Sequence, residues 1–166
     1  MATAIKKPYD PKKVEDRIYR RWERSGFFNP DRLPGKRGKP FTIIMPPPNA
    51  NGALHIGHAV FVTLQDIMVR FWRMRGRKAL WLPGADHAGF ETQVVFDKKL
   101  AKEGRSRSDV PRDQLYAEML KFTLENKKIM EAQLRKLGAS CDWSREKFTL
   151  DPDIIRIVTD TFAELY

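Results

Sequence analysis

The chain has 166 residues, a mass of 19.3 kDa and a formal net charge of +10, and 42% of its residues are hydrophobic. This composition is that of a globular domain or part of one and excludes a disordered or fibrous protein, while the single cysteine, Cys141, excludes an internal disulfide framework and a multi-cysteine zinc site. The chain shows no signal-peptide pattern and no run of about 20 apolar residues, so we expect a cytoplasmic protein without membrane contact, whose basic surplus indicates a polyanionic partner.

The first predicted element is an amphipathic helix of about four turns. Asp10 and Pro11 are typical of a helix start, and Gly26 ends the pattern. Between them, apolar residues recur at every fourth position: Val14, Ile18 and Trp22. Prolines, glycines and charges dominate residues 29–40 and predict a loop, so residues 1–40 form an N-terminal helix with a connecting loop.

A strand and a helix follow. Residues 41–45 (FTIIM) predict a short buried strand because they are apolar, partly β-branched and followed by three prolines. Residues 46–52 form a turn, and a helix then extends from Leu54 or His55 to Met74. Its apolar residues cover most of its circumference, so we expect it to be buried on several sides.

The later segments continue the alternation of strands and helices. We predict strands at 79–82 and 147–150, and helices at 89–103, from Pro111 to about 137, and from 151 onward. This order predicts an α/β fold with a parallel sheet. The last helix has no stop signal before Tyr166, and two or three strands do not complete a sheet, so we expect the chain to be truncated within a longer protein.

The chemistry is concentrated where the first strand meets the second helix. Ligands of open α/β sheets bind beyond the carboxyl ends of strands, and a helix N-terminus offers N–H groups to phosphate oxygens. His55 and His58 are three residues apart and therefore share one helix face, while Gly57 between them lets a flat ring approach the backbone. This arrangement suits a nucleoside triphosphate whose α-phosphate is attacked.

Two other interpretations of these histidines remain open. Both can be ordinary core or surface residues of an apolar helix. Alternatively, His55, His58 and His87 form a three-histidine zinc site, as in a zinc hydrolase. No glutamate stands beside them in an H-E-x-x-H pattern, so we predict no metal site and no zinc in this segment.

Residues 46–59, P-P-P-N-A-N-G-A-L-H-I-G-H-A, resemble the His-Ile-Gly-His signature of class I aminoacyl-tRNA synthetases. The resemblance implies that residues 41–166 are the first half of a Rossmann-like parallel-sheet catalytic domain, truncated before the editing insertion. It also implies activation of an amino acid by ATP, with Mg²⁺, and transfer to tRNA. His55 and His58 would bind the ATP phosphates and stabilise the transition state. Gly57 would allow close approach of the adenine, and Asn51 would belong to the same ATP site.

A second sequence block indicates which amino acid is the substrate. Residues 82–93, L-P-G-A-D-H-A-G-F-E-T-Q, are similar to the G-T-D-H-A-G-x-x-T-Q stretch of valyl-tRNA synthetases. The resemblance implies that the substrates are valine and tRNA(Val). Two departures favour the runner-up, an isoleucyl enzyme: Glu91 replaces a smaller or apolar residue, and residues 50–52 (A-N-G) are commoner in isoleucyl enzymes.

The resemblance also implies an amino-acid site. Asp86 would pair with the substrate ammonium group, because a carboxylate and an ammonium form a charge-assisted hydrogen bond. Pro47 would form part of the wall against the valine side chain, since a rigid ring without an N–H suits a small apolar pocket. Asn49 would contact the substrate or order the loop. His87 and Gln93 would contact the substrate or support the loop.

The chain contains no K-M-S-K-S sequence, which the family uses to hold the triphosphate. The editing domain, the second catalytic half and the anticodon-binding domains are absent too, so the missing C-terminal portion of the enzyme is an expected partner. We expect the isolated fragment to be inactive or very weak. The competing hypothesis is a stand-alone basic module that binds nucleotide or RNA. With a tRNA partner, Arg70, Arg73 and Arg77 would contact phosphates; alternatively, they simply form a solvated face.

Overall fold

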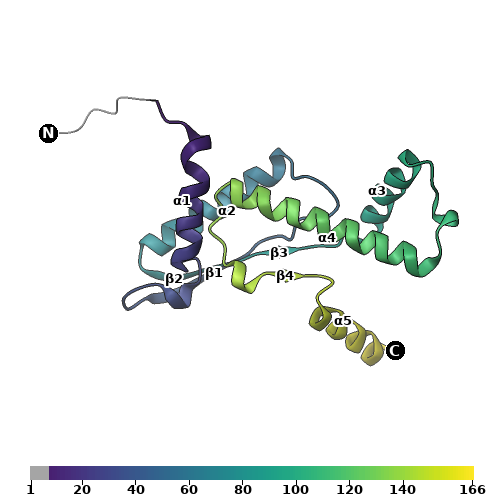
Figure 1. The fold of residues 1–166 in the computed structure, drawn as a ribbon. Helices are drawn as coiled ribbons and strands as arrows, with labels where there is room; N and C mark the ends of the chain where they lie inside the picture. Colours follow the sequence, from purple (N-terminus) through teal and green to yellow (C-terminus); the bar gives the residue numbers. More distant parts are fainter. Residues whose placement is uncertain (1–7) are drawn as a thin grey trace.

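The computed structural model describes residues 8–166 (Figure 1). Its helices and strands are, in chain order, α1 (Pro11–Ser25), β1 (Gly38–Ile44), α2 (Ile56–Met74), β2 (Arg77–Leu82), β3 (Gly84–Ala85), α3 (Gly89–Lys102), α4 (Arg112–Lys136), β4 (Lys147–Phe148) and α5 (Pro152–Leu165). Three single 3-10 turns lie at Pro30–Arg32, Arg107–Asp109 and Trp143–Arg145. Within these described residues, no helix combines the length and apolarity that crossing a membrane requires.

The strands form two parallel pairs, which confirms the predicted α/β fold. β1 pairs with β2, with Phe41 opposite Ala79 and Ile43 opposite Trp81. The helix α2 connects these two strands, as a parallel crossover requires. Farther along the chain, β3 pairs with β4, also in parallel. Because β1 and β2 are parallel, their carboxyl ends are adjacent. An isolated bridge between Asn49 and Asp86 also places the turn after β1 beside the segment after β3.

The main core lies where α2 and α4 meet the β1–β2 pair. Its buried residues are Met45, Val62, Val69, Ala79, Trp81, Leu134, Ala139 and Cys141. The indole Nε1 of Trp81 donates to Gln65 Oε1 at 2.9 Å, so this fully buried ring leaves no donor unpaired. Burial raises the pKa of the Cys141 thiol, which is therefore a protonated packing residue, not a nucleophile.

Helix α1 is fastened to the core through Tyr19. The Tyr19 hydroxyl donates to the carbonyl of Ala139 at 2.8 Å and accepts from Trp143 Nε1 at 2.8 Å. The predicted limits of this helix are confirmed, since it begins after Asp10 and ends at Gly26. The Asp10 side chain does not cap the helix; it pairs with Lys13 at 2.9 Å instead.

We expect Tyr19→Phe to lower the free energy of unfolding by roughly 1–3 kcal/mol, because it leaves the Ala139 carbonyl and the Trp143 indole N–H without their partner. Urea unfolding of the 166-residue chain measures the change. Tyr9→Phe is the matched control, since Tyr9 is 68% exposed, and it leaves the midpoint unchanged. Equal midpoints for the two variants would show that the Tyr19 bridge does not hold α1.

Some element limits differ from the prediction. β1 begins at Gly38, within the predicted loop, and its register with β2 is irregular between Gly38 and Pro40, since proline has no N–H to donate. The predicted strand 147–150 is shorter, with only Lys147–Phe148 paired. β3, at Gly84–Ala85, was not predicted, because Pro83 and Gly84 indicated only a turn.

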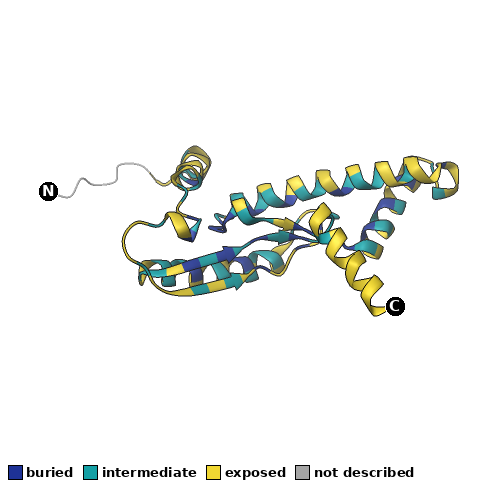
Figure 2. Cartoon of the chain, turned by 90° about the horizontal axis from the view of Figure 1, so that it is seen from below, coloured by how far each residue is buried: buried dark blue, intermediate teal, exposed yellow. Residues whose placement is uncertain are grey.

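The expectation that α2 is buried on several sides was wrong. Of its residues, only Val62 and Val69 are buried. One side of α2 packs on β1 and β2, whereas the opposite side carries large exposed apolar side chains. The large apolar side chains of this exposed α2 face are Ile56, Val60, Leu64, Ile67, Met68, Phe71 and Met74. α5 has no buried residue at all and is coloured almost wholly as exposed in Figure 2.

Two arginines of α2 form hydrogen bonds to the segment that follows α4. Arg70 donates to the Gly138 carbonyl at 2.9 Å, and Arg73 donates to Ser140 Oγ at 3.1 Å. Asp66 accepts from the Ser140 N–H at 3.0 Å. These bonds hold the segment after α4 against α2. Arg70 and Arg73 therefore have hydrogen-bond partners within the chain, whereas the sequence suggested a solvated face or a phosphate-contacting face.

Candidate functional site

The two histidines close the N-terminal end of α2. His55 is the residue before the helix, in an extended conformation (φ −119°, ψ 176°). Its Nδ1 accepts a hydrogen bond from the Gly57 N–H at 3.1 Å. The Nδ1 of His58 in turn accepts from the His55 N–H at 3.2 Å. The pair thus forms a reciprocal capping box in which imidazoles take the places of the usual hydroxyl and carboxylate.

These hydrogen bonds fix which ring nitrogen carries the proton. A neutral imidazole has one acceptor nitrogen and one N–H, and Nδ1 is the acceptor in both rings. The proton of each neutral ring is therefore on Nε2. The ring centroids are 4.1 Å apart, at an interplanar angle of 60°. The pair therefore presents two Nε2–H donors at a helix N-terminus, which suits anionic oxygens.

The electrostatics keep His58 neutral. Partial burial, followed by the nearby His55, lowers the pKa of His58 below its ordinary value of 6.5. A neutral His58 retains both its Nδ1 acceptor and its Nε2–H donor at pH 7. Since the unfolded chain binds this proton more readily than the folded chain, His58 makes folding less stable as the pH falls below 6.5.

We expect an NMR titration to place the His58 midpoint below 6.5 in the folded chain. His55→Asn removes the neighbouring positive charge that forms at low pH, so it should raise the His58 midpoint toward the ordinary value. The chain has only three histidines, so selective ¹⁵N labelling gives a simple spectrum. A His58 midpoint above 6.5 in the unmodified chain would contradict this account.

Gly57 is required by the ring of His55. A Cβ at position 57 would lie 2.9 Å from His55 Cε1 and 3.0 Å from its Nδ1, closer than real Cβ atoms approach other atoms. The absence of a side chain at Gly57 therefore makes room for the capping imidazole. In the structure, the ring next to Gly57 is that of His55, whereas the role expected from the sequence, close approach of the adenine, stays a prediction.

Most of the residues predicted for the site line one cavity. It has a volume of about 420 Å³ and lies over the turn after β1 and the start of α2. Its lining consists of Pro46, Pro47, Pro48, Asn49, Asn51, Ala53, Leu54, His55, His58 and Phe61. The predicted ATP and amino-acid residues of the first motif thus share one open cavity. Gly57 does not line this cavity, although it lies between the two histidines that do.

Asp86 is joined to this turn through the backbone. The Asp86 N–H donates to the Pro48 carbonyl at 2.9 Å, and the Ala50 N–H donates to the Asp86 carbonyl at 2.7 Å. The Asp86 carboxylate accepts from the Ala88 N–H at 2.9 Å and remains 38% exposed. The structure therefore places Asp86 directly beside the turn that carries Pro47 and Asn49, although Asp86 does not line the same cavity.

His87 and Gln93 lie apart from the other two histidines. They line a separate, mainly apolar cavity of about 260 Å³ between α3 and α4. Gln93 Oε1 accepts from Arg107 Nη1 at 3.1 Å, and His87 is hydrogen-bonded to Thr149. Sequence reasoning missed Thr149, because its place beside Asp86 depends on the pairing of β3 with β4.

The three histidines do not converge. Among residues 8–166, no cluster of three or more His, Cys, Asp or Glu side chains has the arrangement that a metal ion needs. The alternative of a three-histidine zinc site, with His87 joining the capping pair, is therefore wrong for this structure.

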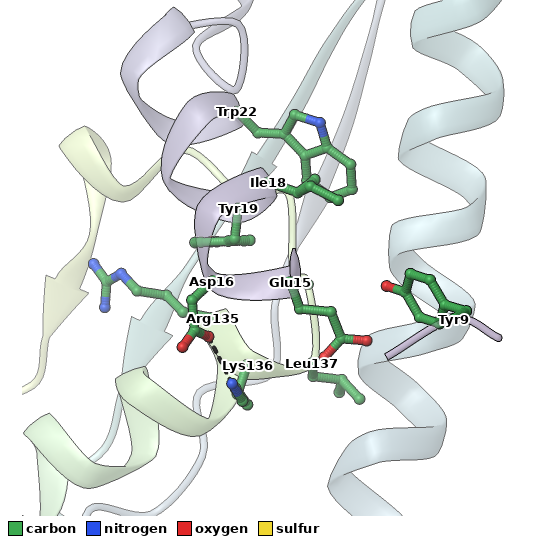
Figure 3. A pocket seen from close by; sticks show the side chains of 10 residues that line it. Tyr9, Glu15, Asp16, Ile18, Tyr19, Trp22, Arg135, Lys136 and Leu137 are labelled. Atoms are coloured by element: carbon green, nitrogen blue, oxygen red, sulfur yellow. Dashed lines mark hydrogen bonds and ion pairs between the residues drawn. The ribbon is translucent and has the colours of Figure 1, made fainter. Parts of the chain in front are cut away.

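A third cavity, of about 270 Å³, lies between α1 and the end of α4 (Figure 3). It shares no residue with the cavity of the histidine pair. Figure 3 shows the carboxylates of Glu15 and Asp16 among its lining side chains, with Asp16 paired to Lys136 at 2.6 Å. Arg135 and Lys136 balance these carboxylates in the lining, and none of the residues predicted for the site lines this cavity, so the candidate site remains the cavity at the start of α2.

Comparisons with known proteins identify relatives of this chain. A family described as tRNA synthetases class I (I, L, M and V) matches residues 17–166. The valine--tRNA ligase of Caulobacter vibrioides is 48% identical over 163 residues, which are 98% of this chain and 18% of that protein. The chloroplastic/mitochondrial valine--tRNA ligase 2 of Arabidopsis thaliana is 51% identical over 152 residues, which are 92% of this chain and 15% of that protein. The chain thus spans less than a fifth of the length of these relatives.

A solved structure shares the fold. The LeuRS of Agrobacterium radiobacter K84, in a ternary complex with tRNA and LeuAMS, matches 96% of this chain and 18% of its own length with a TM-score of 0.75. The sequences are 24% identical over this match, so the likeness shows the fold alone.

Proposed function

This chain belongs to the class I tRNA synthetases (I, L, M and V), and from that premise we propose that it forms part of an enzyme that activates valine with ATP and transfers it to tRNA(Val). The observation that carries the proposal is the capping pair His55–His58, whose two Nε2–H donors adjoin an open cavity beside Asp86. The proposal covers the reaction of the whole enzyme, of which this chain supplies one part.

We propose that the histidine pair serves the ATP half of the reaction. A carboxylate oxygen of the amino acid attacks the α-phosphorus, pyrophosphate leaves, and negative charge accumulates on the phosphate oxygens in between. Neutral N–H donors held in place before the reaction stabilise that charge without reorganising. Asn51 lines the same cavity, and Gly57 lets the His55 ring take its place. Mg²⁺ would enter as part of the ATP substrate.

The amino-acid half of the proposal rests on Asp86. Its carboxylate, held by the Ala88 N–H and still partly exposed, suits an ammonium group. The Pro47 ring offers an apolar wall, and Asn49 lies beside Asp86 through an isolated backbone bridge. An apolar wall distinguishes poorly between aliphatic side chains that differ by one methylene. The choice of valine over isoleucine therefore follows from the names of the relatives.

We also propose the division of the chain into an N-terminal helix with its loop, residues 1–40, and the first half of a Rossmann-type catalytic domain, residues 41–166. The exposed α2 face would pack against a part of the enzyme that corresponds to the remaining length of the relatives. We place the reaction in the cytoplasm, with tRNA(Val) as the macromolecular partner.

Exchange of labelled pyrophosphate into ATP tests the proposal. The chimera for this test carries the 166-residue chain in place of the matched 163 residues of the Caulobacter vibrioides ligase. We expect valine-dependent exchange by the chimera and none of useful rate by the isolated chain. A chimera that folds, by circular dichroism and gel filtration, yet shows no valine-dependent exchange would overturn the proposal. Exchange with isoleucine in preference to valine would support the isoleucyl alternative.

A further inference from the structure

Thr149 occupies a position that no sequence motif marks. It follows β4 directly, and its N–H donates to the Ala85 carbonyl at 3.2 Å, which continues the pairing of β4 with β3. This pairing brings Thr149 beside residues that precede it by more than 60 positions in the chain. Thr149 therefore adjoins the proposed amino-acid site, although it lies far from that site in the sequence.

Three groups converge on the Thr149 hydroxyl. The His87 N–H donates to Thr149 Oγ1 at 2.9 Å. The Nδ1 of His87 lies 2.6 Å from the same oxygen. The hydroxyl donates to Asp86 Oδ1 at 3.2 Å. The same Asp86 oxygen also accepts from the Ala88 N–H at 2.9 Å, so Oδ1 has two hydrogen-bond donors, and the Nδ1 of His87 lies 3.5 Å from it.

A proton count assigns the roles of these groups. A hydroxyl has one proton and two lone pairs, and the His87 backbone N–H already uses one lone pair. An ionised carboxylate only accepts, and a hydrogen bond to it is stronger than one between neutral groups. The hydroxyl proton therefore goes to Asp86. The remaining lone pair faces His87 Nδ1, so Nδ1 must donate and Nε2 carries no proton in the neutral ring.

We propose that Thr149 is a positioning residue: its hydroxyl orients the Asp86 carboxylate and holds His87 as the Nδ1–H tautomer. His87 thus carries its proton on Nδ1, whereas both rings of the capping pair carry the proton on Nε2. The unprotonated Nε2 of His87 is then available as an acceptor. The tautomer is inferred from the proton count at the Thr149 hydroxyl, whereas the effect on substrate binding rests on the proposed function.

NMR of the ¹⁵N-histidine-labelled 166-residue chain above the histidine titration range tests the tautomer. We expect two rings with a protonated Nε2 and one ring, His87, with a protonated Nδ1; His87→Gln identifies the latter signal by its loss. Thr149→Ser keeps the hydroxyl and this pattern. Thr149→Val, which has nearly the same shape, removes the preference for Nδ1–H. Three Nε2–H rings in the unmodified chain, or an unchanged His87 tautomer in folded Thr149→Val, would overturn the proposal.

The chimera tests the orientation of Asp86. We expect Thr149→Val to raise the KM for valine about tenfold, because the carboxylate loses one of its two donors, while the KM for ATP stays unchanged. Thr149→Ser keeps the valine KM within about twofold of the starting value. Equal rises in both KM values would indicate a merely structural role and refute the positioning role.

The NMR experiment and the kinetic experiment distinguish a failure of the proposed function from a failure of the positioning role of Thr149. A chimera without valine-dependent exchange would refute the proposed function, and the tautomer spectra would still decide the role of Thr149 toward His87. If Thr149→Val does not fold, the spectra of the unmodified chain and of Thr149→Ser remain decisive.

Discussion

Replacing His58 by asparagine in the chimera is expected to lower the rate of valine-dependent exchange by about 10²–10³-fold. The shorter amide keeps a polar group near the position of Nδ1, where the His55 N–H is capped, but it has no donor at the position of Nε2. The loss therefore reports the missing donor to the phosphate oxygens. ATP–pyrophosphate exchange at saturating valine measures it.

His58→Gln is the matched control for this prediction. Its longer amide offers an N–H near the position of Nε2 but no acceptor at Nδ1, so it weakens the cap and keeps the donor. We expect it to retain more activity than His58→Asn, although it is the less stable variant by up to about 1 kcal/mol. If activity instead follows stability, with the asparagine variant more active, His58 serves the helix and not the reaction.

Lys127→Met is expected to lower the free energy of unfolding by about 2–3 kcal/mol. The Lys127 ammonium lies between Glu131 and Glu146, at 3.0 Å from Glu146 Oε2, and these side chains are only 16–18% exposed. Without the ammonium, two carboxylates remain close together in a largely buried setting, which is strongly destabilising. We place the effect below that of a fully buried pair because some solvent reaches the group. Urea unfolding of the 166-residue chain measures it.

The pair Lys99–Glu103 provides the comparison for Lys127. It has the same spacing on a helix and a distance of 2.7 Å, but its side chains are 40–45% exposed. Lys99→Met should leave the unfolding midpoint nearly unchanged, since solvent replaces the lost partner. Equal effects of Lys99→Met and Lys127→Met would contradict the view that burial makes the Lys127 cluster important.

Local spacing predicted the parts of the site that lie close together in the chain. His55 and His58 share one helix face because they are three residues apart, and this is the spacing of a capping box. Pro47, Asn49 and Asn51 line the same cavity as the histidines because they belong to the turn that leads into α2. The helix type of α1 was also predictable, since it has a repeating apolar pattern and a start signal at Asp10 and Pro11.

Features that depend on contacts between distant segments were not predictable in the same way. A strand of two residues, such as β3 at Gly84–Ala85, is too short for any periodic pattern to reveal. Thr149 reaches Asp86 only through the pairing of β3 with β4, so no local signal marks it. The apolar circumference of α2 predicted burial, but hydrophobicity does not say whether the covering segment belongs to this chain.

We propose that the Nε2–H groups of His55 and His58 face a bound nucleotide and that Asp86 binds the amino-acid end of the adenylate. The most direct test of this central claim is NMR of the ¹⁵N-labelled 166-residue chain with a non-hydrolysable valyl-adenylate analogue. We predict that the analogue shifts the Nε2–H signals of both histidines and the amide signals of Asp86 and Ala88. Shifts confined to residues of the α1–α4 cavity, or no shifts at saturating analogue, would contradict the claim.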